Sequence, residues 1–303
     1  MVPSYGGLTA GLSGNFAGVH RGHGRVPAGA RAIAAAEGLR VVAVTFDPHP
    51  MSVLRPEHAP TTLTSLPARA ELLGDAGAGA VLAVPFDRDM ASWTPEHFAL
   101  RVLVDTLHAR AVVVGASFRF GRRAAGDVAT LVAVGEQHDY TAEGIPLDGG
   151  PMVWSSTYIR TCLAAGDVAG AAEALGRPYA VRGVVVKGDQ RGRELGYPTA
   201  NVPIDPLTAA PADGVYAGRL RRLDTDEVFP AAISVGTNPT FDGERERRVE
   251  TYVLDHTDLA LYGVEVEVSF VALLRGMVAF ASVPELLAQM QDDVQRAREI
   301  LGA

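Results

Sequence analysis

The first 176 residues alternate short apolar runs with helical patterns, and this order constrains the fold more than any other feature. Three mostly apolar, Val-rich runs lie at residues 39–46, 80–84 and 111–115. Runs of this kind are typical of strands buried on both faces of a parallel sheet. Helical patterns cover residues 26–37, 66–73 and 95–107, the last with Thr94 as a candidate N-cap. The order predicts a doubly wound α/β domain, in which ligands bind beyond the carboxyl ends of the strands.

The pattern changes after a helix that we expect Asp167 to cap and Gly176 to end, which puts a domain boundary between residues 176 and 177. Short β runs follow at residues 179–186, 215–220, 228–235, 249–254 and 264–274. Turn signals separate them, which predicts an antiparallel sandwich or small barrel. The last helix, residues 283–301, has an apolar stripe of Leu286, Leu287, Met290, Val294, Ala297 and Leu301. We expect this stripe to pack on the barrel.

Charge and cysteine content narrow the class of protein. The 303 residues carry 27 Lys and Arg against 35 Asp and Glu, a net charge of −8. This charge argues against nonspecific binding to nucleic acid or to an anionic membrane. Cys162 is the one cysteine of the sequence, which excludes an intrachain disulfide and a multi-cysteine metal site and fits a cytoplasmic location. We find no signal-peptide pattern and no apolar run long enough to span a bilayer, and a homo-oligomer stays open.

Residues 187–201, KGDQRGRELGYPTAN, have the composition of a phosphate-binding loop. The stretch contains three glycines (Gly188, Gly192, Gly196) and three cations (Lys187, Arg191, Arg193). Glycines let backbone N–H groups approach an anion, and the cations suit a polyphosphate. If the end is extended, Thr199 and Asn201 share one face, and their oxygens suit Mg²⁺ beside a nucleotide. A polar surface hairpin is the alternative interpretation.

Polar residues follow each predicted strand of the first half. Residues 14–23, GNFAGVHRGH, place His20 and His23 three apart, where two imidazoles could stabilise a phosphate. Asp47 and Ser117 follow the second and fourth strands. Each of these side chains could also be a turn, surface or packing residue.

Two further groups of residues could take part in phosphate chemistry. Residues 155–160, SSTYIR, open a helix, so that Ser155, Ser156 and Thr157 could cap it or bind phosphate, with Arg160 one turn later. Alternation along VETYVLD puts Glu250 and Tyr252 on one face of a strand. Glu250 could act there as a general base, or it could be an ordinary strand glutamate in contact with solvent.

Taken together, these motifs resemble the bacterial bifunctional riboflavin kinase/FMN adenylyltransferase family, also called FAD synthetase. The motifs appear in order along nearly the whole chain: GNFAGVHRGH, VTFDPHP, VVVGASFRFG, SSTYIR, LGRPY, GDQRGRELGYPTAN, DGVYAG, SVGTNPTF, VETYVLD and LYG. The resemblance implies a Rossmann-like nucleotidyltransferase domain over residues 1–176 and a riboflavin kinase β-barrel with a C-terminal helix over residues 177–303. The implied kinase makes FMN from riboflavin and ATP, and the implied adenylyltransferase makes FAD from FMN and a second ATP, releasing pyrophosphate.

The resemblance also implies roles for individual residues. In the kinase, Lys187, Gly188, Gly192, Arg193, Gly196 and Thr199 would bind nucleotide, Thr199 and Asn201 would hold Mg²⁺, Arg275 would contact flavin, and Glu250 would be the base. In the adenylyltransferase, the nucleotide would contact Gly14, Asn15, Phe16, Ser155, Ser156, Thr157 and Arg160. His20 and His23 would stabilise phosphates there, and Asp47 and Ser117 would lie on the flavin side.

The chain departs from the family pattern at a few positions. Ala17 stands where the family usually has Asp, and Ser117 where it has Asn or Asp. Met277 and Ala279 replace a Glu and a Lys that are common near the kinase flavin site. Three hypotheses follow: a bifunctional enzyme, a kinase whose adenylyltransferase is weakened or repurposed for a flavin analogue, and a non-catalytic flavin- or nucleotide-binding protein. The intact Thr199, Asn201 and Glu250 argue against the third.

Overall fold

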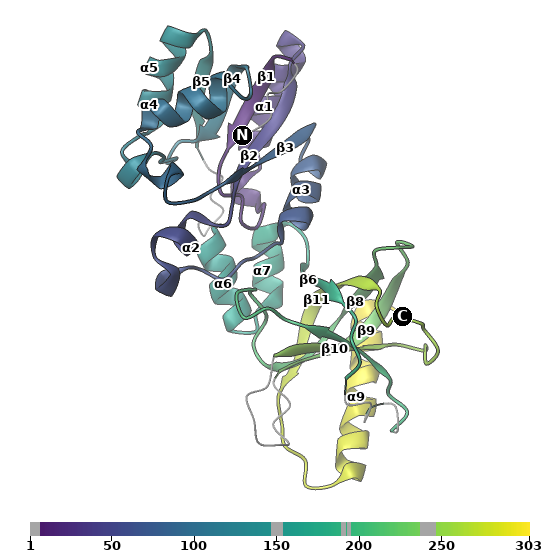
Figure 1. The fold of residues 1–303 in the computed structure, drawn as a ribbon. Coiled ribbons are helices and arrows are strands. Elements are labelled where there is room, and N and C mark those ends of the chain that lie inside the picture. Colours follow the sequence, from purple (N-terminus) through teal and green to yellow (C-terminus); the bar gives the residue numbers. More distant parts are fainter. Residues whose placement is uncertain (1–6, 147–153, 189–191, 193–194, 237–246) are drawn as a thin grey trace. The chain divides into compact units, whose positions relative to one another are not determined.

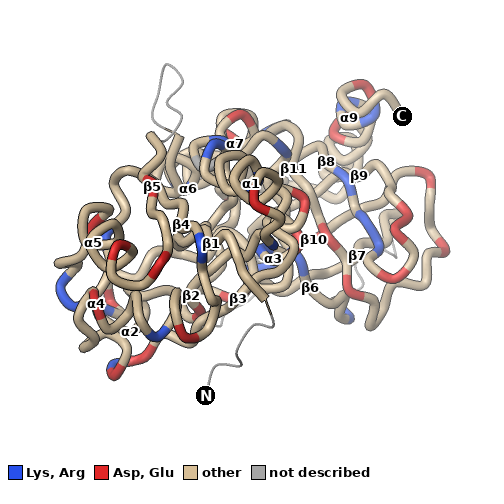
Figure 2. The backbone as a smooth tube through the Cα atoms, turned by 90° about the horizontal axis from the view of Figure 1, so that it is seen from above, with Lys and Arg blue, Asp and Glu red and all other residues tan. Residues whose placement is uncertain are grey.

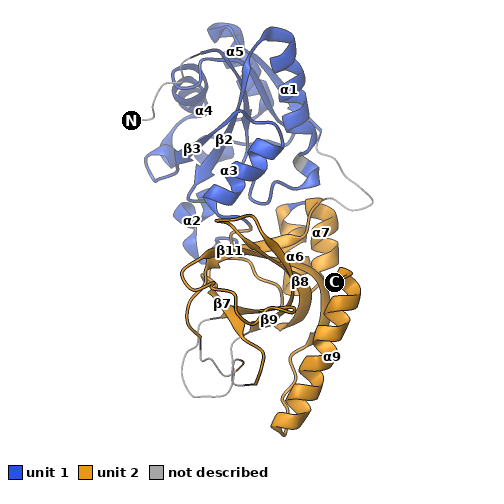
Figure 3. Ribbon diagram, turned by 90° about the vertical axis from the view of Figure 1, so that its right-hand side faces the viewer, with its two compact units in different colours: residues 1–60, 64–155 blue, residues 61–63, 156–303 orange. Residues whose placement is uncertain are grey.

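The structure is a computed structural model that describes residues 7–146, 154–188, 192, 195–236 and 247–303 (Figure 1). Basic and acidic residues are interspersed along the backbone of both halves (Figure 2). The chain forms two compact units (Figure 3). Unit 1 contains residues 1–60 and 64–155, and unit 2 contains residues 61–63 and 156–303. Within the described residues, no helix is both long enough and apolar enough to cross a membrane.

Unit 1 is built on a parallel five-stranded sheet with the order β3-β2-β1-β4-β5. The strands are β1 (Thr9–Ser13), β2 (Arg40–Asp47), β3 (Ala80–Pro85), β4 (Ala109–Gly115) and β5 (Thr141–Ile145). Because β1 and β4 are neighbours while their chain connections run to opposite sides, the strand order reverses between them. The parallel sheet and its strand order confirm the Rossmann-like expectation. Open α/β sheets bind ligands at such a switch point.

Helices cover both faces of this sheet because alternate residues of each strand point to opposite faces. The helices of unit 1 are α1 (Arg25–Glu37), α2 (Pro50–Leu54), α3 (Leu66–Asp75), α4 (Pro95–Phe98) and α5 (Val128–His138). Val41 and Ala43 of β2 pack in a cluster with residues of α1 and α3. Val42 and Val44 pack in a second cluster with residues of α4 and α5. The predicted helix over 95–107 begins as expected at Thr94 but continues beyond Phe98 as π-helix (Ala99–Val104).

Unit 2 contains a six-stranded antiparallel sheet with the order β6-β11-β8-β9-β10-β7. The strands are β6 (Tyr179–Val184), β7 (Thr199–Pro203), β8 (Gly214–Arg222), β9 (Val228–Gly236), β10 (Arg248–Val253) and β11 (Glu265–Gly276). Val186, just beyond β6, forms an antiparallel bridge to Asn201 of β7. This bridge joins the two edge strands and curls the sheet toward the expected barrel.

Three helices complete unit 2: α6 (Ser156–Ala164), α7 (Val168–Leu175) and α9 (Val283–Leu301). Asp167 caps α7 and Gly176 ends it in the left-handed conformation, as expected. Along the predicted stripe of α9, Val294, Ala297 and Leu301 pack with residues of β8, β9 and β11, whereas Leu286, Leu287 and Met290 are half-buried. By their contacts α6 and α7 group with the barrel. The boundary at 176/177 stays a prediction about where each activity resides.

Candidate functional sites

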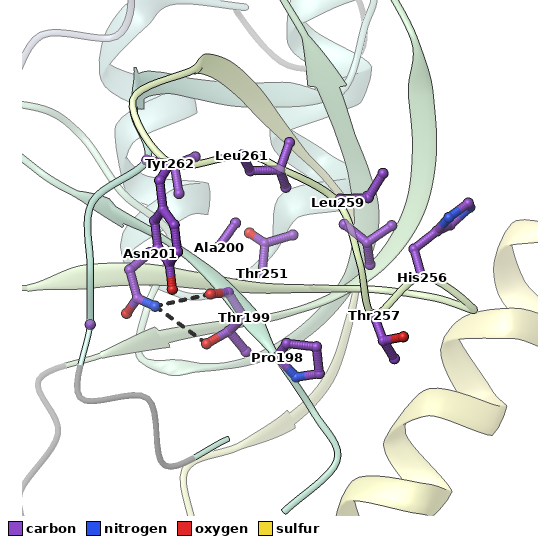
Figure 4. Close-up of a pocket in the computed structure, with 13 residues that line it drawn as sticks. Pro198, Thr199, Ala200, Asn201, Thr251, His256, Thr257, Leu259, Leu261 and Tyr262 are labelled. Carbon is purple, nitrogen blue, oxygen red and sulfur yellow. Dashed lines mark hydrogen bonds between the residues drawn. The ribbon is translucent and has the colours of Figure 1, made fainter. Parts of the chain in front are cut away.

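A pocket in unit 2 brings several of the predicted kinase residues together (Figure 4). Its lining comes from the β6 exit, β7, β10 and the segment after β10: Val185, Gly188, Pro198, Thr199, Ala200, Asn201, Thr251, Val253, His256, Thr257, Leu259, Leu261 and Tyr262. Gly188, Thr199 and Asn201 were predicted from the sequence. The pocket therefore combines an apolar wall with a small group of convergent polar atoms, which is the usual character of a ligand site.

The polar side of this pocket is a Thr199–Asn201 pair packed against a glycine. Nδ2 of Asn201 donates to the backbone oxygen of Thr199 at 3.2 Å and to its hydroxyl at 3.3 Å. Both side chains therefore lie together, as the extended conformation of β7 requires. A Cβ atom at Gly188 would stand 2.6 Å from Cγ, Nδ2 and Oδ1 of the Asn201 amide. Only glycine leaves room for the amide at this point.

Glu250 lies directly opposite Asn201 in the β7–β10 pairing, and Tyr252 lies opposite Thr199. Opposed residues of antiparallel strands project to the same face, so all four side chains share one face. Burial agrees with this arrangement, since Val249, Thr251 and Val253 are buried whereas Glu250 and Tyr252 are half-buried. Glu250 is not part of the pocket lining. The Thr199–Asn201 pair thus belongs both to the pocket and to the face that carries Glu250.

The glycine-rich loop before β7 is described only in part, and Arg191 and Arg193 lie outside the described residues. The carbonyl of Gly192 accepts the N–H groups of Leu195 at 3.1 Å and Tyr197 at 2.7 Å. Gly196 has a φ of +85°, which favours glycine. Lys187 is exposed. The predicted nucleotide contacts of this loop stay predictions.

Sequence reasoning missed part of the pocket wall. The hydroxyl of Thr251 is fully buried and has no hydrogen-bond partner among the described residues. His256, Thr257 and Leu259 line the pocket from the segment after β10. Only the Leu261–Tyr262 pair of this segment belongs to a family motif. The other residues gave no sequence signal, because their position depends on how a loop folds back over β7.

Arg275, predicted to contact flavin, holds helix α9 to the end of β11. Its Nε donates to both carboxylate oxygens of Asp293 at 3.0 Å, and Nη2 donates to one of them at 2.7 Å. Nη1 donates to the Gly276 carbonyl, and the guanidinium lies 5.6 Å from the centre of the Phe280 ring. The side chain of Asp293 is only 5% exposed. A flavin contact of Arg275 stays a prediction beside this observed structural role.

In unit 1 the predicted adenylyltransferase residues gather at the carboxyl edge of the sheet. Gly14, Asn15 and Phe16 directly follow β1, Asp47 is the last residue of β2, and Ser117 follows β4 by two residues. The pairing of Ser13 with both Val44 and Val114 sets these strand ends at one level. The three exits therefore lie at the switch point and its neighbour, where phosphate ligands bind in sheets of this type.

The turn after β1 is tightly held. Phe16 has a φ of +44°, and its ring is 2% exposed in the core beneath the sheet edge. A Cβ at Gly14 would contact this ring at 3.1 Å. Asn15 is exposed, and Ala17, which replaces the usual family acid, is buried. The turn thus presents the backbone of residues 14 and 15 at the edge.

Gly22, in the turn that leads into α1, lies close to both His20 and the backbone of Trp154. His20 is 5% exposed and precedes a 3₁₀ turn (Arg21–His23). A Cβ at Gly22 would stand 2.6 Å from the carbonyl oxygen of Trp154 and 3.0 Å from Nδ1 of His20. The guanidinium of Arg21 lies 5.7 Å from the centre of the Trp154 ring. Trp154 was missed by sequence reasoning; the side chain of His23 lies outside the described part of the structure.

Ser156, Thr157 and Arg160 lie on helix α6 and belong to unit 2. Nε of Arg160 donates to the backbone carbonyl of Thr61 at 2.7 Å. Burial lowers the pKa of Arg160, and nearby Tyr179 partly opposes this effect. Arg160 therefore ties the short segment 61–63 to helix α6 within unit 2. Its predicted contact with a triphosphate stays a prediction, as do those of Ser156 and Thr157.

Two family models match the chain, one over each half. The model described as FAD synthetase matches residues 10–150, and the model described as riboflavin kinase matches residues 175–301.

Curated relatives match both halves in one alignment. A bifunctional riboflavin kinase/FMN adenylyltransferase of Escherichia coli K12 is 37% identical over 95% of this chain and 91% of its own length. A protein of the same description from Pseudomonas fluorescens is 35% identical over 98% of this chain and 94% of its own. A crystal structure of a protein described as a macrolide-efflux protein from Streptococcus pneumoniae superposes with a TM-score of 0.85 and 30% identity, covering 97% of this chain and 95% of that chain.

Proposed function

Because the chain belongs to the family of bifunctional riboflavin kinase/FMN adenylyltransferases, we propose that it phosphorylates riboflavin to FMN and then adenylylates FMN to FAD. ATP is the co-substrate of both reactions in this proposal. The observation that carries it is the match of such relatives to nearly the whole chain, 95% and 98% of it, both units included. The two reactions need two nucleotide sites, one in the barrel pocket and one at the carboxyl edge of the parallel sheet.

For the kinase reaction, we assign the ATP phosphates to the polar side of the barrel pocket and riboflavin to the face that carries Glu250. The shared position of Thr199 and Asn201 supports this assignment, since the pair lies both in the pocket and on that face. The ribityl 5′-hydroxyl would attack the γ-phosphate of ATP. Glu250 would accept the hydroxyl proton during the attack.

The Thr199–Asn201 pair fits a magnesium ion. Its donors are a hydroxyl and an amide oxygen, and Mg²⁺ is usually held by one or two protein oxygens together with waters and substrate phosphates. No group of three His, Cys, Asp or Glu residues suited to a metal occurs in the described residues, so the phosphates would supply the remaining charged ligands. A bound Mg²⁺ would neutralise charge on the phosphates. The Gly188 contact would keep the Asn201 amide in place for it.

For the adenylyl transfer, we assign the second ATP to the turn after β1. The phosphate of FMN would attack the α-phosphate, and pyrophosphate would leave. His20, Ser155 and the backbone N–H group of Asn15 would stabilise charge on the phosphates, while Asp47 and Ser117 would lie on the flavin side. We also propose that this activity resides in residues 1–176 and the kinase in residues 177–303, in a cytoplasmic protein without a nucleic-acid partner.

The kinase assignment is tested by Glu250→Gln, with each half-reaction measured separately by chromatography of the flavins. Loss of a general base typically costs a factor of about 10² to 10⁴, so we expect FMN formation from riboflavin to fall by this amount. FAD formation from supplied FMN should stay within about twofold of wild type. Glu265→Gln, at an exposed position of β11, is the matched control. Equal loss of both half-reactions would contradict the two-site assignment.

A further inference from the structure

A buried guanidinium lies beneath the carboxyl edge of the parallel sheet. Arg69 of α3 is 6% exposed. Burial lowers its pKa, and the nearby charge of Asp47 partly opposes this effect. Within the described residues, no carboxylate lies at ion-pair distance from it. A buried cation without a carboxylate partner must be stabilised by hydrogen-bond acceptors. The acceptors of Arg69 therefore show which segments its side chain holds in place.

The acceptors of Arg69 come from two different segments. Nη1 donates to the hydroxyl of Thr45 at 3.1 Å and to the carbonyl of Phe46 at 3.2 Å. These are the two residues of strand β2 that precede its last residue, Asp47. Nη2 donates to the carbonyl of Thr64, before α3, at 3.3 Å. The planar guanidinium donates to the two segments from two separate nitrogens, whereas a lysine would have to reach both from one ammonium nitrogen.

Thr45 and Thr64 in turn hydrogen-bond to the turn after β1. The Thr45 hydroxyl, fully buried, donates to the carbonyl of Asn15 at 3.1 Å. The Thr64 hydroxyl donates to the carbonyl of Ala17 at 2.7 Å. These two carbonyls flank Phe16, the residue with a φ of +44°. A non-glycine residue keeps such a conformation only where its surroundings fix it on both sides.

We propose that Arg69 is a positioning residue for adenylyl transfer, which acts through Thr45 and Thr64 to fix the turn of residues 15–17. The proposal rests on the assignment of the second ATP to this turn. Arg69 would touch no substrate. It would set the direction of the backbone N–H group that faces the phosphates, and would thereby govern affinity for ATP more than affinity for FMN.

The test compares Arg69→Met, Arg69→Lys, Thr45→Val and Thr64→Val with wild type. The threonine variants keep the side-chain volume and remove one hydroxyl each, so they weaken the network without opening a cavity. Arg110→Met is the matched control, since Arg110 lies at the opposite end of the sheet and donates to the Asp139 carbonyl. Kinase activity of the same chain, and its thermal midpoint, report on folding.

We expect Arg69→Met to lower kcat/KM for ATP in FAD formation at least tenfold, mainly by raising KM for ATP. Each threonine variant should lower it about threefold to tenfold, and Arg69→Lys should recover part of the loss. Arg69→Met combined with Thr45→Val should cost no more than Arg69→Met alone, because the two residues act in one chain of contacts. FMN formation and KM for FMN should stay within about twofold of wild type.

A binding measurement separates this proposal from the assignment on which it rests. Titration with α,β-methylene-ATP, which cannot donate an adenylyl group, should detect two sites in wild type, one of them weakened at least tenfold by Arg69→Met. A single site in wild type would refute the two-site assignment. Two sites that Arg69→Met leaves unchanged would overturn the role of Arg69. So would threonine variants with wild-type KM for ATP, or equal loss of both activities in all Arg69 and threonine variants.

Discussion

Replacing Gly188 by alanine tests the geometry of the barrel pocket with one added methyl group. The new Cβ would stand 2.6 Å from three atoms of the Asn201 amide, a separation below 3.0 Å that real Cβ atoms essentially never show. Gly188 does not have a positive φ, so alanine is acceptable to the backbone itself. Asn201 is 6% exposed and belongs to the β7 ladder. We therefore expect its amide to turn away rather than its backbone to move.

The cost follows from the contacts that the amide would lose. Nδ2 of Asn201 makes two hydrogen bonds to Thr199, at 3.2 and 3.3 Å. A hydrogen bond contributes about 0.5–1.5 kcal/mol, so loss of both is worth about 1–3 kcal/mol. This loss lowers the stability of the folded chain. The turned amide also no longer presents its oxygen to the pocket, so kcat/KM for ATP in FMN formation should fall at least about fivefold, which corresponds to about 1 kcal/mol. Any loss of a magnesium ligand would add to this.

The assay is FMN formation from riboflavin at varied ATP, with FAD formation from supplied FMN as the control within the same chain. Gly74→Ala is the matched control substitution, because an added Cβ at Gly74 would meet no heavy atom of another residue within 4 Å among the described residues. We expect Gly74→Ala to leave both activities unchanged. If Gly188→Ala also keeps kcat/KM for ATP within twofold of wild type, the pocket geometry or its assignment to ATP is wrong.

Two further predictions concern stability. Asp293→Leu should lower the free energy of unfolding by about 3–5 kcal/mol in urea denaturation, because it leaves the guanidinium of Arg275 without its carboxylate. Adding Arg275→Met to this variant should recover much of the lost stability. Additive losses of the two substitutions would contradict the pairing. Burial raises the pKa values of Tyr140 and Tyr216 to about 12, against about 10 when unfolded. The unfolded chain therefore loses these protons first, and stability should fall by about 1.4 kcal/mol per pH unit for each tyrosine between pH 10 and 12. If Tyr140→Phe or Tyr216→Phe removed an ionisation near pH 10 from the native ultraviolet titration, this prediction would be refuted.

The layers of the fold could be predicted because their strands have strong local patterns. Strands β2, β3 and β4 have nearly continuous apolar runs, and all three were predicted within two residues. The edge strand β5, TAEGI, was missed because it is short and partly exposed. Helix α5 was missed although Asp127 and Thr130 form a capping box at its start. The π-helical segment after Phe98 depends on how that helix packs, which no local pattern specifies.

The candidate sites depend more on long-range pairing. The sequence predicted that Thr199 and Asn201 share a face, and it separately predicted the face of Glu250. That the two faces coincide follows only from the β7–β10 register. The Arg69 network joins α3, β2 and the turn after β1 through side chains far apart in sequence. No spacing within one segment could predict it.

The two departures in unit 1 bear on the alternative of a weakened adenylyltransferase. Ala17 is buried, and its carbonyl accepts from Thr64 at 2.7 Å, so the turn is held without an acid at this position. Ser117 is exposed after β4. Their effect on FAD formation decides between the bifunctional enzyme and a chain that stops at FMN.

The measurement that tests the central claim most directly is a time course of the wild-type protein with riboflavin, ATP and Mg²⁺, followed by separation of the flavins. Two working sites predict that FMN rises first and that FAD then accumulates as FMN is consumed, with pyrophosphate released in step with FAD. FMN that accumulates without FAD would contradict the assignment of adenylyl transfer to unit 1. Riboflavin that stays unchanged would contradict the account as a whole.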